Sequence, residues 1–87
     1  MSYNYTKERA ELFTEDGVKT LREVEAEVDK LLMRAGAFRY THLRVSGNSF
    51  TILAALDYLI ETKKLVRLPR PSWAQYYVYT TPEVHNL

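Results

Sequence analysis

The chain of 87 residues contains no cysteine. It can therefore form neither a disulfide framework nor a zinc site with thiolate ligands. Its two histidines, His42 and His85, are too few to hold a metal ion without carboxylate partners. The sequence predicts no metal site and no bound cofactor.

Glycine is also scarce. The three glycines, Gly17, Gly36 and Gly47, lie far apart, so the chain has no glycine-rich loop of the kind that cradles phosphates. No two histidines, and no glutamate and histidine, have the spacing of a helical metal motif, and the serines in loop-like stretches have no acid–base partner nearby. We therefore expect a protein that is not an enzyme.

Long apolar runs are absent as well. No stretch approaches the ~20 apolar residues that span a bilayer, and the N-terminus lacks the basic start and apolar core of a signal peptide. We expect no membrane contact and a cytoplasmic location. A chain this short forms one domain with a thin margin of stability. A homodimer is therefore expected, and the size is compatible with a phage or mobile-element protein.

Charge of the two signs is nearly balanced but unevenly spread. Residues 1–33 hold five Lys/Arg and eight Asp/Glu, a balance of −3, whereas residues 34–87 hold seven and three, a balance of +4. A basic C-terminal half beside an acidic N-terminal half fits a protein that binds nucleic acid through one face.

The clearest pattern begins at Ser49. It predicts a helix over residues 49–63, because Ile52, Leu56 and Leu59 recur at helical spacing. The short polar side chain of Asn48 or of Ser49 itself can cap the first turn.

A β-hairpin is predicted to follow this helix. Residues 65–68 change to the period of a strand, and residues 76–80 are rich in tyrosine, valine and threonine, which favour strands. The seven residues between them, 69–75, contain two prolines and the only tryptophan.

A second helix is predicted from Thr20, where Thr-Leu-Arg-Glu matches a capping box, to a left-handed glycine cap at Gly36. Gly17-Val18 is an alternative, earlier entry to this helix. Its apolar stripe comprises Leu21, Val24, Val28, Leu31, Leu32 and Ala35. The stripe can pack on the domain core, which we favour, or form part of a homodimer seam.

Both ends of the chain are assigned separately. Residues 1–17 are predicted as an N-terminal arm or short helix, with Thr6 as the cap of two helical turns and residues 14–17 as a turn. Residues 81–87 are predicted as a flexible tail, because Pro82 ends any strand.

The middle of the chain completes the pattern. Residues 37–40 can form a short strand that pairs with the hairpin as a third strand. Residues 41–47 are left for a helix and a turn, so this helix is either a single turn or belongs to a truncated variant of the fold.

The C-terminal half resembles the second half of a winged-helix domain, a helix-turn-helix variant with a β-hairpin wing. The resemblance rests on the helix segment 55–61, the strand 64–67 and the return strand 77–80. Lys64 stands where glycine is common in that family. The resemblance implies a small α+β winged-helix domain over residues 18–80, with about three helices and a C-terminal wing.

A winged-helix fold implies a regulator that binds double-stranded DNA. A helix start with small polar donors suits phosphate contact, asparagine can read an adenine edge, and arginines on a wing suit the backbone or minor groove. The contacts would come from the start of helix 49–63 and the wing 65–79. The candidate DNA-binding residues are Arg39, His42, Arg44, Asn48, Ser49, Thr51, Arg67, Arg70 and Trp73.

A second hypothesis is a winged-helix module that docks a protein partner. With Ile52, Leu56 and Leu59 in the core, the helical period turns another set of residues outward. These are Phe50, Ala54, Asp57, Tyr58 and Glu61. That face carries two acids and aromatics, which suits phosphate poorly. The docking residues would be Phe50, Tyr58 and Trp73.

Overall fold

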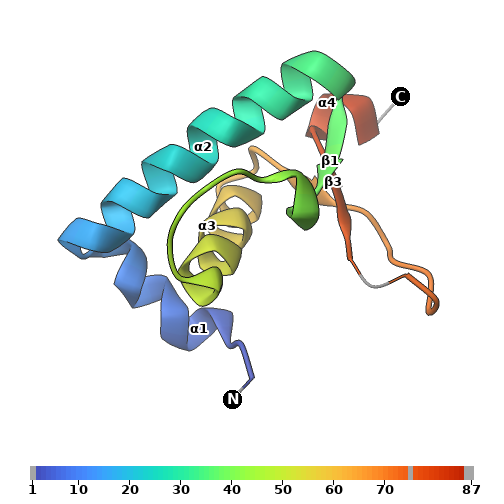
Figure 1. The fold of residues 1–87 in the computed structure, drawn as a ribbon. Coiled ribbons are helices and arrows are strands. Elements are labelled where there is room, and N and C mark those ends of the chain that lie inside the picture. The colour runs from blue at the N-terminus through green and yellow to red at the C-terminus, as the bar shows by residue number, and fades with distance from the viewer. Residues whose placement is uncertain (1, 75, 86–87) are drawn as a thin grey trace.

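A computed structural model describes residues 2–74 and 76–85 and shows a small α+β domain, as the sequence predicts (Figure 1). In chain order the elements are α1 (Tyr5–Glu8), the 3-10 helix η1 (Arg9–Phe13), α2 (Glu15–Ala35), β1 (Ala37–Arg39), the 3-10 helix η2 (Tyr40–His42), α3 (Ser49–Glu61), β2 (Val66–Arg67), β3 (Val78–Thr80) and α4 (Pro82–His85).

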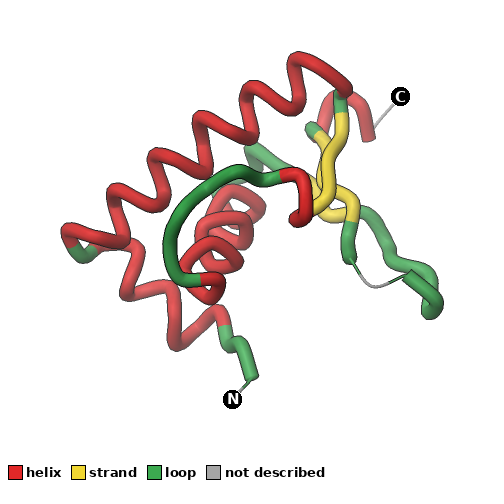
Figure 2. Tube along the Cα trace, in the orientation of Figure 1, coloured by secondary structure: helices red, strands yellow, loops and turns green. Residues whose placement is uncertain are grey.

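The three strands form an antiparallel sheet in the order β1-β3-β2. The predicted third strand is confirmed, because Phe38 pairs with Tyr79 across β1 and β3 and their rings stack with centroids 5.3 Å apart. The wing is the hairpin of β2 and β3 together with the loop between them, residues 65–79. Figure 2 shows it projecting away from the helices.

Helix α2 begins five residues earlier than its predicted start, at Glu15 instead of Thr20. Thr14 is the N-cap, and its hydroxyl accepts a hydrogen bond from the Gly17 amide at 3.1 Å. Two acids in the first turn, Glu15 and Asp16, also suit the positive end of the helix dipole. The predicted capping box at Thr20 was therefore wrong, and so was the turn over residues 14–17. The boundary placed after residue 17 lies inside α2.

The apolar stripe of α2 packs on the chain's own core. Val24 and Val28 are buried, and Leu21 is half-buried against the same core. Ile52 and Leu56 of α3 meet them in this core. The favoured interpretation of the stripe is confirmed, and the buried part of it is closed to a second chain.

The second helix predicted for residues 41–47 is a single 3-10 turn, η2, followed by an extended connection to α3. Figure 2 shows this connection running across α3. At the other end of the domain, residues 82–85 form α4 where a flexible tail was predicted. Residues 86–87 of that predicted tail lie outside the described residues. Among the described residues no helix is long and apolar enough to cross a membrane.

Helix α3 ends at Glu61, two residues before its predicted end. The chain reverses at Lys63, which has a left-handed backbone with φ of 64°. The amide of Lys64 then donates to the carbonyl oxygen of Leu59 at 2.9 Å, which satisfies a carbonyl of the last turn. The position that favours glycine is therefore Lys63, and the assignment of that role to Lys64 was wrong.

We expect Lys63→Gly to stabilise the domain. A non-glycine residue in the left-handed region costs roughly 1 kcal/mol, so its removal should raise the melting temperature by about 4–8 °C. Thermal unfolding followed by circular dichroism measures the change. Lys64→Gly is the matched control, because Lys64 has no positive φ and should lose stability. Equal melting temperatures for the two variants would contradict the assignment.

Candidate nucleic-acid interface

The N-terminal arm, residues 3–13, lies against α3. The hydroxyl of Tyr3 donates to Asp57 Oδ2 at 2.6 Å, and that of Tyr5 donates to Glu61 Oε1 at 2.8 Å. Leu12 of η1 is fully buried in the core. The arm therefore joins α3 by polar contacts along one side and by an apolar anchor at its end.

Arg9 makes a bidentate contact with Glu61. Its Nε and Nη2 donate to the two carboxylate oxygens of Glu61 at 3.0 and 2.8 Å. The guanidinium also lies over the rings of Phe13 and Tyr58, 5.4 and 5.7 Å from their centroids. The hydrogen bonds from Arg9 and Tyr5 hold the pKa of the Glu61 carboxyl below its usual range.

The pKa values of the two tyrosines of the arm are shifted in the opposite direction, upwards. Partial burial, with the hydrogen bond to Glu61, raises the pKa of Tyr5 to about 12. Burial and the hydrogen bond to Asp57 raise the pKa of Tyr3 further above its ordinary value. Both phenols therefore stay protonated, as donors to the carboxylates, at all physiological pH values.

The predicted outward face of α3 is largely covered. Ala54 is fully buried, so its assignment to an open face was wrong. Phe50 is half-buried and contacts the Tyr3 ring at 5.9 Å, and half-buried Tyr58 meets Phe13 edge-on at 5.7 Å. The proposed docking patch is therefore not continuous. The arm covers this face through long-range contacts, which the periodicity of the α3 sequence does not indicate.

The start of α3 opens onto an acidic hollow. Asn48 uses its side-chain oxygen to cap the helix, accepting from the Phe50 amide at 2.8 Å, and Ser49 is exposed at the first turn. A hollow of about 380 Å³ beside Asn48 and Thr51 is lined by three carboxylates and one lysine. The carboxylates are Glu11, Asp16 and Glu23. Negative charge at this helix start disfavours phosphate.

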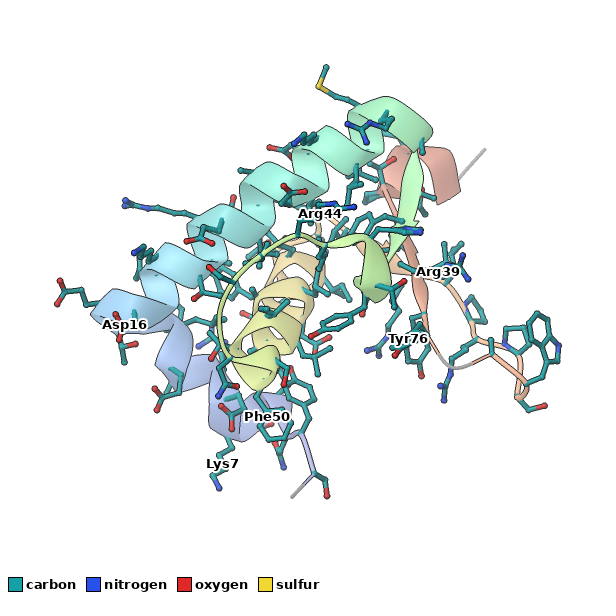
Figure 3. The ribbon with its side chains drawn as sticks, in the orientation of Figure 1. Lys7, Asp16, Arg39, Arg44, Phe50 and Tyr76 are labelled. Carbon is teal, nitrogen blue, oxygen red and sulfur yellow. The ribbon has the colours of Figure 1, made fainter. Side chains whose placement is uncertain are left out.

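A groove of the opposite charge lies between α2 and the segment after β1. Its volume is about 450 Å³, and its lining includes Lys30 and Arg34 of α2 together with His42 and Arg44. The one carboxylate in the lining, Glu27, lies 3.9 Å from the Lys30 ammonium. Figure 3 shows Arg44 near the middle of α2. We call these residues the basic groove.

Sequence reasoning found half of this groove. His42 and Arg44 were candidates, whereas Lys30 and Arg34 of α2 were not. Their four-residue spacing puts both on one side of α2, which was the available signal. His42 accepts a hydrogen bond at Nδ1 from the Arg39 amide at 3.1 Å, so Nε2 is the nitrogen left for a ligand.

The remaining candidates lie on the sheet and the wing. Arg39 is exposed at the end of β1, and the next residue, Tyr40, stacks on Tyr76 of the wing with centroids 6.2 Å apart. Figure 3 shows Arg39 and Tyr76 near the start of the wing. This stack joins the segment that carries His42 and Arg44 to the hairpin.

The wing arginines differ in their surroundings. Arg67 lies 3.4 Å from Asp57 Oδ1 and over the ring of Tyr77 at 4.5 Å, so part of its charge is neutralised within the chain. Arg70 lies over the same ring at 4.9 Å. Trp73 is 86% exposed. Arg67 is thus partly engaged within the chain, whereas Trp73 is open to solvent.

We expect Glu61→Gln to loosen the arm, because it removes the charge that Arg9 and Tyr5 bind. Amide hydrogen exchange of residues 5–13 should become faster at neutral pH. In the parent chain the same loosening should appear on acidification. A carboxyl whose pKa is lower in the folded state stabilises the fold at pH values above its unfolded-state pKa of roughly 4.3. That stabilisation is lost as the pH falls through the folded-state pKa.

Glu83→Gln is the control for this experiment. Glu83 is an exposed acid on α4, whereas the arm packs on α3. Unchanged exchange in Glu61→Gln, or equal acceleration in both variants, would show that the carboxylate does not hold the arm.

Comparison of the chain with protein-family models, with curated proteins and with solved structures gives no match. Within residues 2–74 and 76–85, no three His, Cys, Asp or Glu side chains gather in a way that could hold a metal ion. The chemistry of the basic groove and the wing is therefore the basis for a functional conclusion.

Proposed function

We propose that this protein binds double-stranded DNA through the basic groove and the wing, and not through the exposed face of a recognition helix. The observation that carries the proposal is the composition of the groove. Lys30, Arg34 and Arg44 line it together with His42, against the single carboxylate of Glu27. Such a surface attracts a polyanion and releases its counterions on binding.

The wing is also rich in positive charge. No acidic residue occurs between Glu61 and Glu83, whereas the same stretch contains Arg67 and Arg70. Asp57 of α3 pairs with Arg67. The groove and the wing are connected through η2 by the stack of Tyr40 on Tyr76. Duplex DNA is long enough to reach both.

The covering of α3 determines the expected mode of recognition. Its outward residues contact the arm, and its start adjoins three carboxylates. Contacts from arginine and lysine to phosphates position a protein but carry little sequence information. The proposal is therefore a DNA-binding protein of low sequence specificity. Membership of the winged-helix superfamily, a regulatory role, a homodimer and a cytoplasmic location belong to the same proposal.

One observation favours protein docking as the second candidate. Trp73 is almost fully exposed, and tryptophan is enriched in the central contacts of protein interfaces. The other two residues of that hypothesis, Phe50 and Tyr58, are half-buried beside the arm. The docking hypothesis therefore rests on a single side chain, whereas DNA binding is supported by a group of cations.

We expect Arg34→Ala/Arg44→Ala to weaken duplex binding and to flatten its salt dependence. Each lost phosphate contact lowers the slope of log K against log salt concentration by about 1, so the pair should lower it by about 2. Fluorescence anisotropy of a labelled duplex, titrated at several salt concentrations, measures both effects.

Lys19→Ala/Arg22→Ala is the matched control. It removes the same charge from exposed positions of α2, and Lys19 lines the acidic hollow. It should leave the slope nearly unchanged. Equal losses in the two double variants would mean that net charge, and not the groove, attracts DNA. Absence of binding by the parent chain at low salt would refute the proposed function.

A further inference from the structure

The tip of the wing holds Trp73 away from the body of the protein. The Ala74 amide donates to the Pro71 carbonyl oxygen at 3.0 Å, which closes a β-turn with Ser72 and Trp73 at its centre. The indole is 86% exposed. Pro71 and the nearby Pro69 have fixed φ angles, which restrict the conformations of the loop. A large apolar side chain is thus presented to solvent on a restrained turn.

The base of the wing is cationic and braced by aromatic rings. The guanidinium groups of Arg67 and Arg70 both lie over the ring of Tyr77, at 4.5 and 4.9 Å. The neighbouring Tyr76 stacks on Tyr40 outside the wing. The hairpin therefore presents an apolar tip that is flanked by positive charge. This combination of an apolar tip and flanking arginines suits the minor groove at a base step that unstacks easily.

We propose that Trp73 acts as a wedge that enters the minor groove of duplex DNA, inserts between two stacked base pairs and kinks the helix. The inference rests on the proposed function and specifies how the wing contributes to it. Proteins that bind the minor groove use apolar side chains in this way, and the bent duplex then contacts more of the protein surface.

The wedge predicts a sequence preference that needs no hydrogen bond to a base. Pyrimidine–purine steps such as TA unstack easily, whereas A-tracts are stiff. Duplexes with a central TA step should therefore bind more tightly than duplexes with a central A-tract. This agrees with the position of α3, whose covered face cannot provide direct readout in the major groove.

The experiment uses the full chain and two labelled duplexes of equal length, one with a central TA step and one with an A-tract. Anisotropy reports binding, and energy transfer between end labels reports bending. Trp73 is the only tryptophan, so its intrinsic fluorescence reports stacking on bases in the same titration. We expect quenched indole fluorescence, a bent TA duplex and about fivefold tighter binding to that duplex.

Three variants test whether Trp73 causes the bend and the preference for the TA step. Trp73→Ala should lose the bend and the TA preference but retain salt-dependent binding through the basic groove. Trp73→Phe should recover part of both. Ser72→Ala, in the same turn, is the control and should resemble the parent.

Failures of the two proposals are distinguishable. Salt-dependent binding with unchanged indole fluorescence, or an equal bend in Trp73→Ala, would overturn the wedge and leave the proposed function standing. No binding to either duplex at low salt would overturn both.

Discussion

The packing of the N-terminal arm on α3 is the contact on which the surface of this protein depends. Its energetic anchor is Leu12, since full burial of a leucine contributes roughly 1.5–3 kcal/mol. The ion pair between Arg9 and Glu61 is about two-fifths exposed on each side, and exposed pairs contribute little to stability. The polar contacts instead fix the position of the arm along α3, because Tyr3, Tyr5 and Arg9 each select one carboxylate.

This packing also redistributes charge. Glu61 is satisfied by Arg9, and Asp57 is shared by Tyr3 and Arg67. The acids of α3, which would repel a phosphate backbone in an open recognition helix, are thus compensated within the chain. The basic groove keeps its surplus because Glu27 is its one lining carboxylate. The acidic first half and basic second half of the sequence therefore do not form two separate faces: Lys30 comes from the acidic half.

Local pattern predicted the parts of the fold that local physics determines. Apolar residues at helical spacing, such as Ile52 and Leu56, located α3, and β-favouring residues located the sheet. Two errors arose where several local solutions competed: Thr14 and Thr20 are both plausible caps, and Lys63 and Lys64 are both plausible at the reversal. The candidate site was harder to predict from the sequence. Arg39, His42 and Arg44 stood out by charge, but the contacts of the arm join residues 52–56 positions apart. Periodicity carries no information on such pairs.

The burial pattern of α3 explains why the wing, and not this helix, is the better candidate for reading DNA. Leu56 and Leu59 point to one side of α3, whereas Ala54 lies nearly opposite them by the helical period and is also fully buried. A helix that is apolar on opposite sides is an interior helix. In a chain of 87 residues the domain gains core by enclosing α3 between α2 and the arm. The same enclosure removes the surface that a helix needs to enter a groove. The DNA contacts that we propose therefore come from the hairpin and from the segment after β1.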